Sequence, residues 1–283
     1  MTMQNDDNTP DHKDGGFWQD MSGAVGRRRM LGLLGVGAVG VGAWALLGSG
    51  AGRASEIAGL AADGTMCVAP PPETAGPYPA DGTNVQDGQT INVLTDSGIL
   101  RPDIRGSFAG LTGTAEGIPL EVEIRLVDVD LNCTPVAGLA FYLWHCDAAG
   151  GYSIYSVPGV NYLRGLQVSD ATGTVRFTTI LPGCYDGRWP HMHFEVFASP
   201  DAAVNGDDAL LTAQIALPGA DIAALFAKDA RYAASLPNLS RISLASDNVF
   251  SDNTDLQIAQ QTLVLSGDAN GLKGVLTVAL RRS

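Results

Sequence analysis

The chain has 283 residues, of which 45% are hydrophobic, and it carries a formal net charge of -13. Nucleic-acid phosphates are bound by basic surfaces, so this acidic balance argues against a nucleic-acid partner. No internal repeat stands out, and residues 67–283 are long enough to form one domain with a substantial core.

The N-terminal segment is similar to an export signal. Residues 1–25 are acidic and polar and contain little that could pack, which predicts disorder. Next, Gly26-Arg-Arg-Arg-Met-Leu-Gly32 leads into an uncharged, Gly- and Ala-rich apolar run from Met30 to Gly48. Basic residues, an apolar core and small residues behind it are typical of export signals, and the adjacent arginines resemble a twin-arginine signal.

This segment also sets the expected domain organisation. The apolar run is close to the ~20 residues that cross a bilayer, so an uncleaved membrane anchor (30–48) and a buried helix are alternatives to a cleaved signal. We expect an exported protein, periplasmic or extracellular, that meets the twin-arginine machinery during translocation. The expected segments are a tail and basic region (1–29), an apolar signal (30–49), a linker with candidate cleavage points between Ala51 and Ala62 (50–66), and a folded domain (67–283).

Short apolar and polar alternations separated by turn residues predict the fold. Leu120-Glu-Val-Glu-Ile-Arg-Leu126 alternates cleanly, with its aliphatic side chains facing a core and its charged ones facing water. Only Asp221 to Ala234 indicates a helix. Many short strands joined by Gly, Pro and Asp turns favour an all-β, antiparallel β-sandwich with one short helix. The expected strands are 120–126, 137–145, 174–180, 191–198, 212–217, 256–265 and 274–280.

The expected strand 191–198 carries two of the chain's 4 histidines, spaced two residues apart. Strand alternation turns His191, His193 and Glu195 to one face and the intervening apolar residues to the other, so one face packs and the other can bind. Neutral imidazole is a good ligand for several transition metals. Two hydrogen-bonded structural histidines are the alternative. The nearby Tyr185 and Arg188 favour the metal site.

The motifs around this strand resemble the intradiol aromatic-ring dioxygenases. They are Glu73-Thr-Ala-Gly-Pro-Tyr78, Trp144-His-Cys-Asp-Ala-Ala-Gly-Gly-Tyr-Ser153, Leu163-Arg-Gly165 and the stretch from Pro182 to Val196, and the resemblance runs from about Cys67 to near the C-terminus. That family uses non-haem Fe(III) held by two tyrosines and two histidines. The resemblance implies Fe(III) ligands at Tyr152, Tyr185, His191 and His193.

The resemblance also implies roles for three neighbouring residues. Arg188 and Gln214 match polar residues that flank substrate and oxygen, with Arg188 stabilising the oxygen-attacked ring and Gln214 assisting as a hydrogen-bonding partner. Tyr78 matches a residue that reaches the substrate pocket. The alternatives are a structural Arg188 paired with Asp186 or Glu195, and a Tyr78 that only packs in its Pro-Tyr turn.

The implied reaction is ring opening of a small aromatic diol with both atoms of O2, which gives a cis,cis-muconate-type diacid. Two phenolates and two neutral imidazoles form a hard, anionic site that favours Fe(III) over soft-ligand metals such as Cu(I). The alternatives are a non-catalytic sandwich that binds a carbohydrate or a surface, and a Zn-dependent hydrolase that uses His191 and His193, which lacks an obvious third ligand of the usual kind and has Glu195 as a candidate. Neither the particular catechol nor the oligomeric state follows from the sequence.

The chain contains four cysteines, an even number that suits an oxidising compartment. Of the three possible pairings we favour Cys67 with Cys133 and Cys146 with Cys184. The second bridge would tie the turn that carries Tyr185 to the strand that leads into Tyr152. Buried free thiols are the alternative.

Overall fold

The computed structural model of the protein describes residues 57–282. The expected tail, the apolar run from Met30 to Gly48 and the candidate cleavage points before residue 57 lie outside these residues. Within residues 57–282 no helix is long and apolar enough to cross a membrane.

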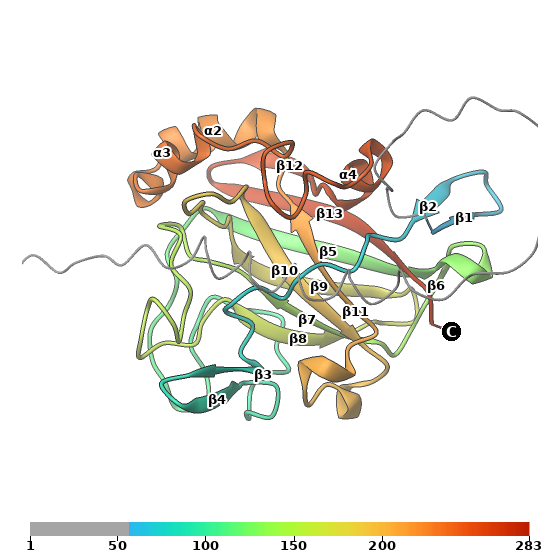
Figure 1. The fold of residues 1–283 in the computed structure, drawn as a ribbon, viewed down its shortest axis with the longest axis horizontal. Coiled ribbons are helices and arrows are strands. Elements are labelled where there is room, and N and C mark those ends of the chain that lie inside the picture. The colour runs from blue at the N-terminus through green and yellow to red at the C-terminus, as the bar shows by residue number, and fades with distance from the viewer. Residues whose placement is uncertain (1–56, 283) are drawn as a thin grey trace, which may run out of the picture.

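Two β-sheets form the body of the fold (Figure 1). The first has the strand order β11-β10-β7-β8, and all its pairs are antiparallel. The second is built on β5, which pairs antiparallel with β9 and β6 and parallel with β13, while β12 pairs with β13. The bounds are β5 (Pro119–Asp128), β6 (Thr134–Pro135), β7 (Ala140–Trp144), β8 (Arg164–Val168), β9 (Thr174–Ile180), β10 (His191–Phe197), β11 (Leu211–Ala216), β12 (Val264–Asp268) and β13 (Gly271–Leu280).

The main core lies between these two sheets. On β5, Leu120, Val122 and Ile124 are buried, as the alternation predicted, and they join one cluster with Met192 and Phe194 of β10. Each fully buried side chain of this kind contributes about 1.5–3 kcal/mol relative to an exposed one. The predicted all-β sandwich is therefore confirmed, with one parallel strand pair, β5 with β13, among antiparallel ones.

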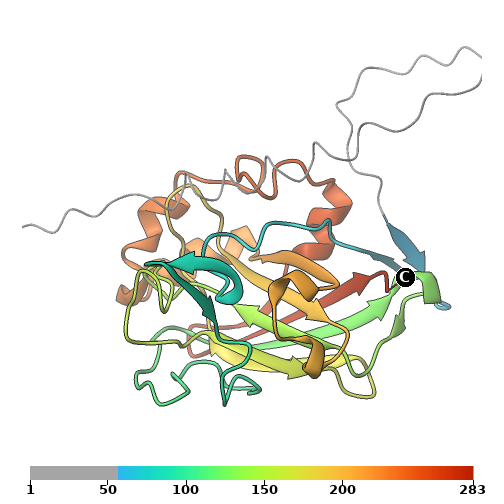
Figure 2. The same ribbon diagram turned by 60° about the horizontal axis from the view of Figure 1, so that its bottom comes forward.

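The outer face of the four-stranded sheet is covered by the chain that precedes β5. Val93, Leu94 and Phe108 form a second apolar cluster with Tyr142 and Trp144 of β7. The β3–β4 hairpin belongs to the same covering region (Figure 2). The face of β10 that carries the two histidines is therefore buried as well. The remaining strands are β1 (Ala58–Leu60), β2 (Met66–Val68), β3 (Asp81–Gln86) and β4 (Gln89–Asn92).

The expected helix over 221–234 is shorter than predicted and is not the only one. Helix α2 covers Gly219–Ala227, and a separate 3-10 turn, η4 (Ala230–Tyr232), begins after Asp229, whose side chain accepts a hydrogen bond from Arg231 N. The Tyr232 hydroxyl donates to Leu181 O at 2.7 Å and pins this turn to the sheets. The other helical segments are η1 (Val129–Leu131), η2 (Pro200–Ala202), η3 (Gly206–Asp208), α3 (Ser235–Leu239) and α4 (Asp255–Gln261).

The expected strand over 256–265 is wrong. Residues 255–261 form α4, and β12 begins only at Val264. The reason is a capping box: Thr254 Oγ1 accepts from Gln257 N at 3.2 Å, and Gln257 Oε1 accepts from Thr254 N at 2.9 Å. Two satisfied backbone donors at a helix start outweigh the short apolar alternation that suggested a strand.

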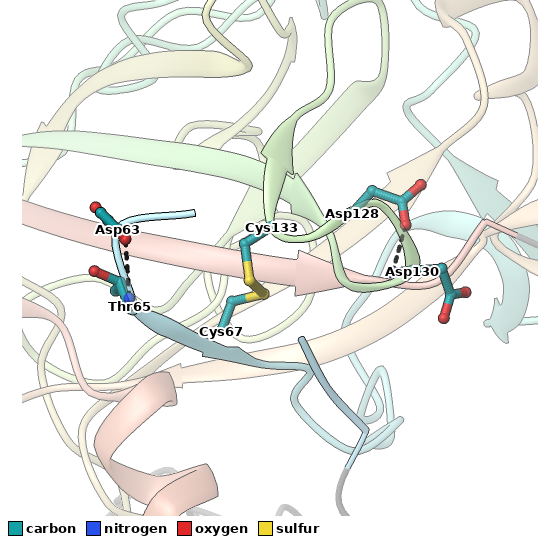
Figure 3. The surroundings of a disulfide bond; sticks show 6 residues. All are labelled: Asp63, Thr65, Cys67, Asp128, Asp130 and Cys133. Atoms are coloured by element: carbon teal, nitrogen blue, oxygen red, sulfur yellow. Dashed lines mark hydrogen bonds between the residues drawn. A yellow bond between two sulfur atoms is a disulfide. The ribbon is translucent and has the colours of Figure 1, made fainter. Parts of the chain in front are cut away.

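One of the two expected disulfides is present. Cys67 on β2 and Cys133, after η1, are bonded (Figure 3). The expected bond between Cys146 and Cys184 is wrong, because both are free and buried. The Cys184 thiol instead lies 3.2 Å from Arg188 O. The two turns that this bond was expected to tie are joined by a backbone hydrogen bond from Gly183 N to Asp147 O at 3.0 Å.

Replacing Cys67 with Ser should lower the free energy of unfolding by about 2–4 kcal/mol, because an unbridged unfolded chain has more conformational entropy. Chemical denaturation with and without reductant measures this. Reductant should destabilise the wild type, and it should have the same effect on a Cys184→Ser control, whose thiol is not bridged. A wild-type protein insensitive to reductant would contradict the bond.

Candidate metal centre

Four side-chain donor atoms converge on one point. The Nε2 atoms of His191 and His193 are 3.0 Å apart. The hydroxyl oxygens of Tyr185 and Tyr152 lie 3.4 Å and 3.5 Å from His191 Nε2. Ligands bonded at about 2.0–2.1 Å to one ion, at angles of 90–120°, are about 2.8–3.6 Å from each other. The spacing of these atoms therefore fits ligands of a single ion.

The two histidines are held by the register of β10. His193 lies opposite Trp144 on β7 and opposite Gln214 on β11. Its ring stacks on the Trp144 indole, with 5.0 Å between centroids and 9° between planes. Met192 and Phe194 point into the core, so the two predicted faces of this strand are confirmed.

The two tyrosines come from turns that touch each other. Tyr152 follows Gly150, which has a φ of 92° and is therefore in a conformation that disfavours other residues. A Cβ atom on Gly150 would lie 3.2 Å from both Cys184 O and Tyr185 Cβ. Glycine thus lets the turn of Tyr152 approach the turn of Tyr185 closely.

His191 presents an unprotonated nitrogen to the site. His191 Nδ1 lies 2.5 Å from Trp189 O, an acceptor, so Nδ1 carries the proton and Nε2 keeps its lone pair. Burial lowers the pKa of His191 well below its usual value, and the positive charge of Arg188 adds to this. Burial, followed by the neighbouring His191, lowers the pKa of His193 in the same way. Both rings are therefore neutral, the form that binds metals.

The surroundings of Tyr152 disfavour its phenolate form unless a cation is bound. Tyr152 is 2% exposed, and burial raises the pKa of its hydroxyl well above the usual value, with Tyr185 adding to the rise. A phenolate here is unfavourable alone, and a bound metal ion reverses that balance. Within residues 57–282 no group of three or more His, Cys, Asp or Glu could hold a metal. The tyrosine hydroxyls are the donors that lie beside the two histidines.

Arg188 and Gln214 both lie at this site. Arg188 Nη1 is 3.4 Å from the Tyr185 hydroxyl, and Nη2 donates to Gln214 Oε1 at 2.6 Å. The alternative pairing of Arg188 with Asp186 or Glu195 is wrong. Its buried ion pair is with Asp247 at 3.0 Å, while Asp186 pairs with Arg241 in solvent.

Glu195 does not complete a histidine-based zinc site. Its Oε1 accepts from the Thr212 hydroxyl at 3.2 Å. Burial, with the nearby Asp81 adding to its effect, raises the pKa of Glu195 to about 9. The side chain is therefore in its neutral form at pH 7 and is bonded to Thr212, which argues against Glu195 as the third ligand of a Zn-dependent hydrolase.

Tyr78 connects the donor cluster with a surface pocket. Its ring centroid is 5.0 Å from that of Tyr152 and 5.0 Å from that of Tyr155. Tyr78, Tyr155 and Asn84 line a pocket of about 280 Å³ on the covering segment. Tyr78 therefore contacts the pocket and the proposed ligand Tyr152 at the same time.

Comparison with known proteins points to one family. The family model described as "Dioxygenase" matches residues 105–231, a segment that contains all four donor residues and Arg188. This segment of the chain is similar to the dioxygenase family. No curated protein sequence matches it significantly.

Solved structures show that the chain shares the fold of intradiol dioxygenases. It is similar to an intradiol ring-cleavage dioxygenase from Tetranychus urticae, with 24% identity, a TM-score of 0.57 and coverage of 76% of this chain and 95% of that one. Dioxygenase Tetur07g02040 gives 24% identity, a TM-score of 0.56 and the same coverage, 76% and 95%. The dioxygenase domain of a carbohydrate-binding fusion from Streptomyces sp. SirexAA-E gives 19% identity, a TM-score of 0.46 and coverage of 76% and 99%. The first two similarities show the shared fold.

A second buried arginine braces the donor cluster. Arg164 Nε donates to Ser153 Oγ at 3.1 Å, and Nη2 donates to Ser153 O at 3.2 Å. Its Nη1 donates to Pro79 O at 2.9 Å. Arg164 thus joins the loop of Tyr152 to the segment of Tyr78.

Asp247 is the residue of this site that sequence reasoning missed. It lies 59 residues beyond Arg188 along the chain, in the connection between α3 and α4. No motif surrounds it, and a lone aspartate in a Ser-rich stretch predicts only a solvated turn. Only the fold brings it to Arg188.

Proposed function

We propose that this dioxygenase is a non-haem Fe(III)-dependent enzyme that opens the ring of a catechol-type substrate between its two hydroxyl-bearing carbons. Both atoms of O2 enter the product, a cis,cis-muconate-type diacid. The observation that carries the proposal is that His193 Nε2, the Tyr185 hydroxyl and the Tyr152 hydroxyl lie 3.0, 3.4 and 3.5 Å from His191 Nε2.

Tyr152, Tyr185, His191 and His193 would hold the ion. Oxygen and imidazole donors with two negative charges suit the hard Fe(III) ion. When bound, Fe(III) supplies Lewis acidity and redox activation of the diol ring toward O2. The chain keeps both imidazoles neutral by burial, so the negative charge of the four ligands comes from the phenolates alone.

Tyr185 is better placed than Tyr152 to take a substrate proton. A catechol that binds as a dianion releases two protons, and a phenolate oxygen is a base that can accept one of them. Tyr185 is half-buried, whereas Tyr152 is fully buried. The Tyr185 oxygen can therefore accept a proton and turn away from the site while Tyr152 stays in place.

Arg188 and Gln214 supply the electrostatic part of the mechanism. Negative charge builds up on the diol ring during attack by O2, and a fixed positive charge beside it lowers the barrier. Arg188 Nη1, next to the Tyr185 hydroxyl, is that charge. Gln214 accepts from Nη2, and its Nε2 donates to Thr74 O at 3.0 Å, which holds the amide in one orientation.

Oxygen uptake by iron-loaded protein tests the proposed function. Catechol, protocatechuate, hydroxyquinol and larger lignin-derived catechols should be screened, and at least one should consume one O2 per ring opened. With ¹⁸O2, mass spectrometry should find two labelled atoms in the diacid. Iron-loaded protein that consumes no O2 with the whole series would refute the proposal.

We also propose that the protein is exported through the twin-arginine route. The N-terminal signal pattern supports this, as does the Cys67–Cys133 disulfide, since such bonds persist in oxidising compartments. This route carries folded proteins, so the metal can be acquired before translocation. Replacing the arginines at 27–29 with Lys should leave the protein in the cytoplasmic fraction. Export of metal-free protein as efficient as that of loaded protein would contradict loading before export.

A further inference from the structure

The Arg188 guanidinium contacts Asp247, Gln214 and Tyr185, and Asp247 lies outside every motif of the chain. Its Nε donates to Asp247 Oδ2 at 3.0 Å, and the side chains of both residues are 0% exposed. Nη2 donates to Gln214 Oε1 at 2.6 Å, and Nη1 is 3.4 Å from the Tyr185 hydroxyl. The guanidinium therefore bridges a carboxylate behind it and the donor cluster in front of it.

The Asp247 carboxylate is itself held rigidly. Its Oδ2 also accepts from Trp189 N at 2.7 Å. Its Oδ1 accepts from Val249 N at 2.8 Å and from Phe250 N at 3.2 Å. Three of its four donors are backbone N–H groups, which cannot rotate away. The carboxylate is a fixed point in the interior.

Fixing two nitrogens of a guanidinium fixes the third. The group is planar, so Nε on Asp247 and Nη2 on Gln214 define the plane and its rotation. The direction of Nη1 toward Tyr185 follows from these two contacts. Four donors share the negative charge of the Asp247 carboxylate, so this carboxylate neutralises the Arg188 guanidinium only in part. The remaining positive charge of the guanidinium is available on the side that faces the donor cluster.

We propose that Asp247 is a positioning residue of the dioxygenase, which directs Arg188 Nη1 to the space beside the Tyr185 hydroxyl where the substrate ring gains negative charge. This inference rests on the proposed function. It assigns to Asp247 no contact with substrate or metal, and it makes the orientation of Arg188, in addition to its charge, a requirement for turnover.

The test compares single and double variants of the iron-loaded protein. Asp247→Asn should keep its iron and its affinity for a catechol, measured by calorimetry without oxygen, while kcat falls about 10²-fold, the scale for a misplacement of about 1 Å. In an Arg188→Ala background, Asp247→Asn should lower kcat no further, because no guanidinium remains to be directed. The exposed neighbour variant Asp186→Asn, which loses only an ion pair in solvent, is the matched control and should keep the wild-type kcat.

Two outcomes would overturn the assignment. One is a wild-type kcat in Asp247→Asn. The other is that Asp247→Asn lowers kcat in the Arg188→Ala background by as much as it does in the wild type, which would indicate a purely structural role for Asp247. If Asp247→Asn does not fold, Asp247→Glu replaces it, since it keeps the charge but moves the carboxylate by one methylene. It should retain iron and lose kcat, and a wild-type kcat would again overturn the assignment.

The result also separates this inference from the proposed function. A wild-type protein that binds no iron and consumes no O2 would refute the function and the role of Asp247 together. An active wild type with fully active Asp247 variants would refute the positioning role alone.

Discussion

Replacing His193 with alanine should remove bound iron and turnover while the sandwich stays folded. The variant loses one of the four converging donors, whose Nε2 is 3.0 Å from that of His191. Loss even of a hydrogen-bonding partner of a metal ligand costs about 10–100-fold in metal affinity or activity, so loss of the ligand itself should cost more. Iron per protein by elemental analysis, kcat and circular dichroism measure the three parts of this expectation.

Met192→Ala is the matched control for this variant. Met192 is the adjacent residue of β10, but it points into the core between the sheets. Its truncation should lower the free energy of unfolding by about 2–5 kcal/mol and leave iron content per folded protein unchanged. Full activity in an iron-loaded His193→Ala protein would refute the ligand assignment.

Arg188→Ala should leave iron bound and lower turnover by about 10²-fold or more, the scale for loss of one electrostatic stabiliser. The same change leaves Asp247 buried without its ion-pair partner. Removing one partner of a buried pair costs about 3–5 kcal/mol, so the free energy of unfolding should fall as well. Denaturant titration measures that fall, and kcat is compared at a temperature where both proteins are folded.

Arg241→Ala provides the contrast. Arg241 pairs with Asp186, next to Tyr185, but both side chains are exposed, at 58% and 73%. An exposed pair is worth about 0–1 kcal/mol, so this variant should keep both stability and turnover. An Arg188→Ala protein with the wild-type kcat would make Arg188 a structural residue only.

The parts of the site that lie on one strand follow from local periodicity. Alternation along β10 separates His191 and His193 from Met192 and Phe194 without knowledge of the rest of the fold, because successive side chains of a strand point to opposite faces. Strand β9 is found at its predicted bounds for the same reason. The convergence of Tyr152 and Tyr185 with the histidines was expected from the family resemblance, and the structure brings the four residues together.

The parts that depend on distant segments could not be predicted. The Asp247 ion pair and the parallel pairing of β13 with β5 join residues far apart in sequence, and no local pattern encodes such contacts. The expected Cys146–Cys184 bond failed because nearness in the fold does not decide whether two thiols bond. The start of α4 had a readable signal in Thr254 and Gln257, which the apolar alternation obscured.

The visible spectrum of the iron-loaded protein tests the tyrosinate site most directly. A free tyrosine has a pKa of ~10, and burial raises the pKa of Tyr152 further, so only a bound metal ion makes it a phenolate at pH 7. Phenolates on Fe(III) absorb visible light by charge transfer, whereas Zn, with its filled d shell, cannot produce such a band. The purified protein should be red-brown, a catechol added without oxygen should shift the band to longer wavelength, and Tyr152→Phe and Tyr185→Phe should each weaken or move it. A colourless iron-loaded protein, or an unaltered spectrum in both single variants, would contradict the site and the intradiol reaction with it.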